Sequence, residues 1–371
     1  MVTLPRSNNL PIEYSAACFD NVTNSYKFYW FLALLEHVRE NQSQIISIND
    51  LLARMIAGVW YPINYFRLSF GKQDRIGQMA VIVADHTNLS MDSNRQEVVH
   101  AIQKFLARNS SVESEIKTLG QYVPFRFLRP FFAQQLKGFV DWKVNESIAM
   151  LSSQTFFDNE SPCIYRFIYQ PATAIEIQAD WFEYMNRNLK ILTDFCMWNL
   201  VTYVQKNNPN VPNIPNKLFK PEQRDLNRAR AFWKLVFDKF GKLTCIYSGR
   251  SMDKNGFSLD HFLPWRFVAH DLLWNIIPTP KSVNSAKSDY LPDMNRYFEP
   301  FAQLQYGAIQ TIASSTKTKL LEDHILLLGL SSIAEIQGFS FQKFLEKMHD
   351  TMSPQFQIAT NMGFSDHWNY A

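Results

Sequence analysis

Glycine is scarce in this sequence and large apolar side chains are abundant, and this imbalance limits the possible folds more than any other feature. Of 371 residues, 12 are glycine and 30 are phenylalanine. A protein built from many short strands needs tight turns, which depend on glycine, whereas helices do not. Hydrophobic residues make up 46% of the chain, which excludes a disordered or low-complexity protein. The composition therefore favours a folded, mainly helical protein.

Apolar residues recur at helical spacing in several segments. Phe28, Phe31, Leu32 and Leu35 lie on one stripe of a helix that Asn24 or Ser25 can begin. The same spacing predicts helices at 47–56, 96–106, 179–206, 223–240, 297–313, 317–328 and 339–348. Strands are expected at 163–168 and 174–177, a strand or helix end at 79–84, a basic aromatic loop at 123–132 and an irregular tail at 352–371.

The segment 207–216 separates two parts of the chain. It contains three prolines and five asparagines, which cannot continue a helix. We therefore predict a helical N-terminal region at 1–206, a linker at 207–216, a compact module with a preceding basic helix at 217–295 and a helical C-terminal region at 296–371.

Charge is distributed unevenly between these parts. The whole chain has a net charge of +3, which excludes a polybasic protein whose composition alone would indicate nucleic acid. Residues 217–295 hold 13 Lys and Arg against 8 Asp and Glu, while the remainder carries −2. Any surface that binds phosphate is therefore expected in this segment.

Cysteine spacing and the lengths of apolar runs indicate the compartment. The four cysteines lie far apart without a C-x-x-C pair, so we expect reduced thiols and no zinc or redox motif. The first 15 residues show no secretory signal, and the longest apolar run, Phe28 to Leu35, is too short to cross a bilayer. We expect a soluble cytoplasmic protein without a membrane partner.

Polar residues at particular spacings follow in the basic module. The sequence runs through Cys245-Ile246-Tyr247-Ser248-Gly249, Asp260-His261, Asn275, Asn284 and Lys287. This pattern resembles the HNH, or ββα-metal, endonuclease family over residues 243–292, and most closely the branch that includes the HNH domain of RNA-guided CRISPR effector nucleases. The resemblance implies a strand ending in Asp-His, a second strand opened by Asn275 and a helix carrying Asn284 and Lys287. Without it, Asp260-His261 would be an ordinary surface pair, and the asparagines ordinary turn and cap residues.

The residue types suit hydrolysis of a phosphodiester. His261 can take a proton from water near neutral pH, so it is the candidate general base. Asp260 and Asn284 offer oxygen ligands for a hard divalent cation, Mg²⁺ or Mn²⁺. Adjacent side chains alternate on a strand, so Asp260 and His261 serve one site only if the strand ends there, which Pro264 supports.

Other residues receive supporting roles. The resemblance implies that Asn275 fixes the loop of the catalytic histidine, and Lys287, one turn after Asn284, is expected to reach the scissile phosphate. Phosphate contacts are predicted at Lys220, Arg224, Arg228, Arg250, Arg266 and Lys281. His270 and Asp271 are interpreted as structural, with a substrate contact as the alternative. Many family members hold a structural zinc, which is not expected here because Cys245 lacks a C-x-x-C partner; large apolar residues are expected to replace it.

These observations predict a mainly α protein with an embedded ββα-metal (HNH) module that cuts DNA. By analogy with the family, we expect a restriction or anti-phage defence effector. One HNH site cuts one DNA strand, so a double-strand break would need a homodimer or two successive cuts. The alternatives are a nucleic-acid-binding or regulatory adaptor with an inactive or signal-gated module, and an enzyme that cleaves RNA. In the gated case, a partner protein or small-molecule signal would act on residues 1–206.

Overall fold

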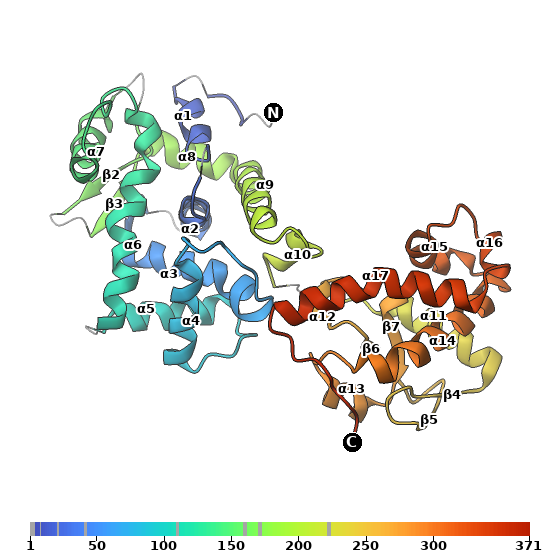
Figure 1. Ribbon diagram of the computed structural model, residues 1–371. Helices are drawn as coiled ribbons and strands as arrows, with labels where there is room; N and C mark the ends of the chain where they lie inside the picture. Colours follow the sequence, from blue (N-terminus) through green and yellow to red (C-terminus); the bar gives the residue numbers. More distant parts are fainter. Residues whose placement is uncertain are drawn as a thin grey trace. The chain divides into compact units, whose positions relative to one another are not determined.

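The chain divides into two compact units. The computed structural model (Figure 1) describes residues 4–7, 9–20, 22–40, 43–108, 111–158, 162–169, 173–220 and 224–371. The N-terminal unit comprises residues 1–209 with 217–219, and the C-terminal unit comprises 210–216 with 220–371. The first division follows Pro209, inside the predicted linker, although the short helix α10 (Ile214–Lys217) begins within that segment.

Helices form most of the N-terminal unit, in agreement with the spacing of its apolar residues. Phe28, Trp30 and Leu34 of the predicted first helix are all buried. Ser47 caps the next helix by accepting a hydrogen bond from the Asn49 amide. The helices are α1 (Ile12–Ala17), α2 (Tyr26–Glu40), α3 (Ile48–Trp60), α4 (Ile76–Thr87), α5 (Arg95–Leu106), α6 (Ser111–Phe127), α7 (Asp141–Thr155), α8 (Ala179–Arg187) and α9 (Leu189–Asn207), with the short helical turns η1 (Tyr61–Tyr65) and η2 (Arg129–Phe132).

Three short strands complete this unit. They are β1 (Ile45–Ser47), β2 (Tyr165–Ile168) and β3 (Ala174–Ile177), with β3 in the middle and antiparallel to both neighbours. Ile175 pairs with Ile46 on one side and with Phe167 on the other. The two predicted strands are therefore confirmed, and β1 is an addition.

Three expectations for this unit were wrong in detail. Residues 79–84 belong to the interior of α4, and residues 123–127 continue α6 through Pro124 instead of forming a loop. Val123 and Phe127 extend the buried stripe of α6, and this burial outweighs the hydrogen bond that proline cannot donate. The predicted helix 179–206 is two helices, because Asn188 leaves helical geometry between α8 and α9.

The C-terminal unit contains two antiparallel strand pairs and several helices. Strands β4 (Lys242–Thr244) and β5 (Ser251–Asp253) form one pair, and β6 (Ser258–His261) and β7 (Ile276–Thr279) form the other. The helices are α11 (Asn227–Phe240), α12 (Trp265–Val268), α13 (Lys281–Lys287), α14 (Met294–Ala313), α15 (Glu322–Leu328), α16 (Ala334–Gln337) and α17 (Phe341–Asn361), with the turns η3 (Leu273–Asn275) and η4 (Thr318–Leu321). The predicted start of the basic helix at Gln223 lies outside the described residues, and α11 begins at Asn227.

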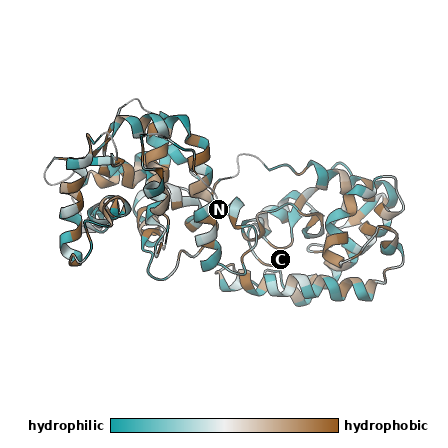
Figure 2. Cartoon of the chain, turned by 90° about the horizontal axis from the view of Figure 1, so that it is seen from above, coloured by the Kyte–Doolittle hydropathy of each residue, from teal (hydrophilic) through white to brown (hydrophobic). Residues whose placement is uncertain are grey.

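The ββα arrangement of β6, β7 and α13 shares one hydrophobic core with the helices on both sides of it. Phe262 stacks on Phe301 of α14 with ring centroids 4.2 Å apart, and α17 packs along α14. Most helices in Figure 2 carry hydrophobic and hydrophilic residues in alternation, as expected of helices with one buried face. The module at 217–295 and the helices after 295 are therefore built on the same core.

The end of the chain also differs from expectation. Helix α17 continues to Asn361 through Pro354, where an irregular tail was predicted, and Met352 and Ala359 are buried. The residues after α17 are irregular and docked, with the Leu291 amide donating to the Ser365 carbonyl.

The expectations for the cysteines and for membrane-spanning segments can also be compared with the structure. The four cysteines are free thiols and buried. Within the described part of the chain, no helix combines the length and apolarity needed to span a bilayer.

Candidate active site

The candidate site lies where β6 ends against the start of β7. His261, the last residue of β6, pairs with Ile276, and Asp260 pairs with Ile277. Because neighbouring side chains on a strand point to opposite faces, Asp260 and His261 contact different partners. The site therefore consists of two adjacent groups, one around each residue.

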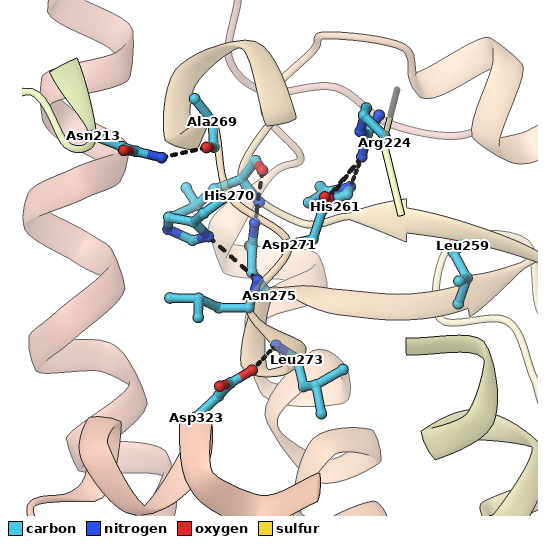
Figure 3. Close-up of polar contacts among 12 residues, drawn as sticks. Asn213, Arg224, Leu259, His261, Ala269, His270, Asp271, Leu273, Asn275 and Asp323 are labelled. Carbon is cyan, nitrogen blue, oxygen red and sulfur yellow. Dashed lines mark hydrogen bonds and ion pairs between the residues drawn. The ribbon is translucent and has the colours of Figure 1, made fainter. Parts of the chain in front are cut away.

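The imidazole of His261 is bonded to Asp271 and covered by Arg224 (Figure 3). His261 Nε2 lies 2.8 Å from Asp271 Oδ1, and Arg224 Nη2 lies 3.0 Å from the same oxygen. Arg224 Nη2 is also 3.3 Å from His261 Nδ1, and the guanidinium stacks over Trp265 at 4.6 Å. Only 6% of His261 is exposed. Both ring nitrogens therefore have a polar neighbour.

This environment holds His261 in the neutral form. Burial lowers the pKa of His261 and nearby Arg224 lowers it further, against the raising effect of the Asp271 hydrogen bond. Burial by itself would raise the pKa of Asp271, but the hydrogen bonds and charges of His261 and Arg224 bring it below the usual range. Since ionised Asp271 only accepts hydrogen bonds, it fixes the ring proton on Nε2 and leaves the lone pair on Nδ1.

Asp260 is buried and has a partner for each carboxylate oxygen. Tyr247 donates its hydroxyl to Oδ2 at 3.0 Å, and Lys287 Nζ lies 3.2 Å from Oδ1. Burial, followed by the charge of Asp260, raises the pKa of Tyr247 well above its ordinary value, so Tyr247 remains a donor. The Asp260 carboxylate is thus paired on both oxygens and held in one orientation.

Asn284 of α13 is anchored to β6 through its amide nitrogen. Its Nδ2 donates to Ser258 Oγ at 3.0 Å and to the Leu259 carbonyl at 3.1 Å, which fixes the orientation of the amide. Within the described residues its Oδ1 accepts no hydrogen bond. One carboxylate and one amide oxygen suit a hard cation that takes its remaining ligands from water and substrate phosphate. The described residues contain no group of three or more His, Cys, Asp or Glu placed for a metal ion.

Asn275 fastens the loop that follows His261. Its Oδ1 accepts from the Leu263 amide at 2.8 Å and its Nδ2 donates to the Leu263 carbonyl at 2.9 Å, with no exposed surface on Asn275. The Phe262 amide donates to the Asn275 carbonyl as well. These bonds support the orienting role of Asn275, which stays a prediction.

Helices from the end of the chain hold the other side of this loop. Asp323 accepts from the Leu273 amide at 2.9 Å, and Gln305 Nε2 donates to the carbonyls of Leu273 and Ile276. Because these bonds flank Asn275, residues from α14 and α15 position the turn that carries both Asp271 and Asn275.

Three residues predicted to contact phosphate are paired with carboxylates of the protein itself. The expectation that Lys287 reaches the scissile phosphate is wrong for this structure: Lys287 is fully buried, and its ammonium bonds Asp260 and the His261 carbonyl. Arg228 pairs with both oxygens of Asp323, and the largely buried Arg266 pairs with Asp289 at 2.7 Å. In each case a nearby carboxylate compensates the charge, a pairing that the sequence spacing did not reveal.

The other basic residues are placed differently. Lys220, Arg250 and Lys281 are exposed, so they remain candidates for phosphate contact, while Arg224 lies at His261. The structure therefore assigns Arg224 to the site itself.

Sequence reasoning missed two residues of the site. Asp271 was interpreted as structural or substrate-binding, whereas its carboxylate bonds the candidate base. Tyr247 belongs to the Cys-x-Tyr-Ser-Gly turn that carried the resemblance, but no role was given to it. Asp271 could have been found from the sequence, because it is a polar residue in the loop between the two strands. Nothing in the sequence pointed to Asp323 and Gln305, because they are distant from the motif.

Comparison with known families identifies the segment that contains this site. A family model described as HNH endonuclease matches residues 245–293, which include β5, β6, β7 and α13. The comparisons with curated proteins and with solved structures gave no match. The chain is therefore mainly α with an embedded HNH module, while the likeness to the CRISPR-effector branch stays a prediction.

Proposed function

We propose that this protein, whose residues 245–293 match HNH endonucleases, is a metal-dependent nuclease that hydrolyses DNA phosphodiester bonds. The observation that carries the proposal is the buried, neutral His261 bonded to Asp271, directly next to Asp260 on β6 and near the free amide oxygen of Asn284. A base and two oxygen ligands on adjacent elements match the needs of phosphodiester hydrolysis.

His261 acts as the general base in this proposal. Its Nδ1 accepts a proton from the attacking water, and the Asp271 carboxylate stabilises the imidazolium that forms. Arg224 lies 3.3 Å from Nδ1, so it has to move aside before water can occupy that position. Phosphate groups of DNA offer Arg224 an alternative partner to Asp271.

Asp260 and Asn284 would hold Mg²⁺ or Mn²⁺. A bound divalent cation would offset the negative charge that gathers on the phosphate and the leaving oxygen. Tyr247 and Lys287, each bonded to one oxygen of Asp260, would hold this carboxylate in place for a cation, and DNA phosphate oxygens would supply further ligands. Lys287 also bonds the His261 carbonyl and so holds the end of β6.

Exposed cations of the C-terminal unit supply the contacts to DNA. Lys220, Arg250 and Lys281 are proposed to bind backbone phosphates. Replacing Arg250 and Lys281 with Glu should weaken DNA binding and lower its dependence on salt. Cytoplasmic location and a role in restriction or anti-phage defence are proposed from the family resemblance alone.

Plasmid cleavage tests the proposal. The full chain is incubated with supercoiled plasmid and, separately, with single-stranded RNA, each with Mg²⁺ or Mn²⁺. His261→Ala is expected to lose at least about 10²-fold in nicking rate, as is usual when a general base is removed. The control is His367→Ala, because His367 is an exposed histidine near the end of the same unit.

The outcomes separate the alternatives. Equal nicking by wild type and His261→Ala contradicts the role of His261 as general base. Cleavage of RNA without cleavage of plasmid would identify RNA as the substrate. If Asn284→Ala loses cleavage while its free energy of unfolding is unchanged, the result supports Asn284 as a metal ligand. Full activity of Asn284→Ala contradicts that role.

A signal-gated module is the second candidate, and the cover over His261 favours it. Arg224 and Asp271 leave 6% of His261 exposed. If the chain is gated, wild type binds plasmid without cutting it and Arg224→Ala cuts. If wild type cuts and Arg224→Ala is no faster, the gated module is excluded.

A further inference from the structure

The N-terminal unit contains a cavity of about 610 Å³ between three helical segments. Its walls come from residues 22–24 before α2, Tyr26 and Lys27 at its start, Arg75 directly before α4, Met79 of α4, five residues of α6, and Arg129. This volume is in the range of small-molecule sites and far exceeds that needed for a single inorganic anion. None of the residues that line this cavity takes part in the proposed nuclease chemistry.

The lining of this cavity is strongly basic. Lys27, Arg75, Arg126 and Arg129 all contribute to it, and no Asp or Glu is among the lining residues. Four cations around one cavity create a positive potential that attracts anions.

Two of these cations pair with carboxylates outside the lining. Arg126 pairs with Asp141, which is 82% exposed, and Arg75 pairs with Glu115, with both side chains about half exposed. Exposed ion pairs contribute little, because water screens them. An anion inside the cavity could therefore compete for Arg75, whereas Arg126 is also held by Asn145 and by the Asp141 carbonyl.

The other two cations are not neutralised by an ion pair. Among the residues that the structure describes, Lys27 and Arg129 form no salt bridge. Burial lowers the pKa of Lys27, and the charge of Arg129 lowers it further, although Cys18 and Asp20 act in the opposite direction. A bound anion would relieve both effects, because it compensates a partly desolvated ammonium and separates two like charges.

The walls are held in place before any ligand binds. The buried Asp74 carboxylate accepts from the Ser25 amide at 2.6 Å and from the Ile76 amide at 3.0 Å, which links the start of α2 to the start of α4. The Tyr26 hydroxyl accepts from the Arg75 amide at 2.8 Å. A site whose backbone is fixed in this way loses little entropy on binding.

The cavity also has an apolar and aromatic side. Met79, Leu119 and Val123 are buried in its wall, while Tyr122, also in the lining, is 56% exposed. An apolar wall beside cations suits a ligand with a flat heterocycle and a charged group, because an aromatic ring can stack on the heterocycle.

We propose that this cavity binds a nucleotide, with the phosphates at Lys27 and Arg129 and the base against Tyr122. Its size, its four cations without a carboxylate in the lining and its aromatic side together distinguish a nucleotide from phosphate alone. The site is separate from the candidate nuclease chemistry, so it can be tested whether or not the chain cuts DNA.

Calorimetric titration of the full chain with ADP, in EDTA so that divalent cations are absent, tests this site. Parallel titrations use pyrophosphate and a single-stranded DNA 10-mer. Lys27→Ala/Arg129→Ala is expected to weaken ADP binding about hundredfold, since each charge-assisted hydrogen bond contributes about tenfold. Tyr122→Ala is expected to weaken ADP about tenfold and to leave pyrophosphate binding unchanged.

The control is Arg187→Ala/Lys190→Ala, which removes two exposed cations of the same unit away from the cavity. Arg129→Ala alone, at an exposed residue, covers the case in which the double variant does not fold. The proposal is overturned if ADP does not bind, if the control weakens ADP as much as the double variant, or if pyrophosphate binds as tightly as ADP. Binding of the 10-mer at these residues without binding of ADP would replace the nucleotide with a nucleic-acid strand.

Discussion

Two histidines of the C-terminal unit, His261 and His324, are kept neutral by different surroundings. For His261 the effect of burial is opposed by Asp271. His324 stacks on Phe232 in the core, and burial lowers its pKa to about 4. Gln305 donates through Nε2 to two carbonyls, so its Oε1 accepts from His324 Nε2, and His324 Nδ1 has no partner among the described residues. A proton on that nitrogen would be a buried, unpaired charge.

The proposed base predicts opposite pH shifts for two substitutions. A histidine base works when neutral, so activity falls as pH falls through the pKa of His261. Asp271→Asn removes a group that raises this pKa, so the acid limb of its pH–rate profile should move to lower pH. Its plateau rate should fall by as much as about 10⁴-fold. Arg224→Ala removes a group that lowers the pKa, and its acid limb should move to higher pH.

Plasmid nicking measured from pH 5 to 8 checks both shifts. If wild type and both variants share one acid limb, the group that titrates is not His261. The two substitutions serve as controls for each other, because mere damage to the site would lower the rate without moving the limb in opposite directions.

His324 predicts a loss of stability in acid. In the unfolded chain a histidine takes up a proton near pH 6.5, whereas folded His324 does so only near pH 4. The unfolded state therefore binds more protons between these values, and stability that is present above pH 6.5 declines as pH falls. The expected loss between pH 7 and pH 5 is about 2 kcal/mol.

Urea unfolding at these two pH values measures this loss. His324→Gln, whose side chain does not titrate, should show a smaller loss than wild type. Equal losses in the two proteins would assign the acid sensitivity to other groups.

At the level of elements, local sequence signals predict several helices and strands, but prolines do not mark where two of the helices end. The resemblance to HNH endonucleases implies β6, the strand that ends in Asp-His, and helical spacing predicts α11 and α14. Helix α6 continues through Pro124 and α17 through Pro354, because their buried faces continue on both sides. A proline is a strong local signal, but burial of a whole face can outweigh it.

Removal of the Asn275 side chain should loosen the end of β6. Asn275→Ala leaves the buried amide and carbonyl of Leu263 without their partner, which costs about 3 kcal/mol in unfolding free energy. Nicking should fall as well, because the loop after His261 loses its support. Urea unfolding and plasmid cleavage measure the two effects, with the exposed Asn255→Ala as the control. Full stability of Asn275→Ala would contradict the orienting role.

For the whole molecule, the decisive feature is the shared core of the C-terminal unit. Phe301 of α14 stacks on Phe262, and Gln305 and Asp323 bond the turn before β7. The matched HNH segment ends at residue 293, so it includes Phe262 but not Phe301, Gln305 or Asp323. The segment therefore lacks part of its own core and part of the support of its site.

Truncation tests this dependence. A fragment of residues 210–371 should unfold cooperatively and retain the nicking activity proposed for the chain, because it contains the whole C-terminal unit. A fragment of residues 210–295 should not fold, since it exposes Phe262 and its neighbours to water. Thermal unfolding followed by circular dichroism measures both. A cooperative transition in the shorter fragment would show that the module folds without α14 to α17.

The sequence alone determined the helical character, the ββα order and the residue types at the site, because composition, spacing and a short motif are local properties of the chain. Only the tertiary structure decided which charges are paired. Lys287, Arg228 and Arg266 are engaged with carboxylates, and Asp271 bonds the candidate base. A lysine or arginine has the same identity whether it faces solvent or a buried carboxylate, and only the packing of distant elements distinguishes the two.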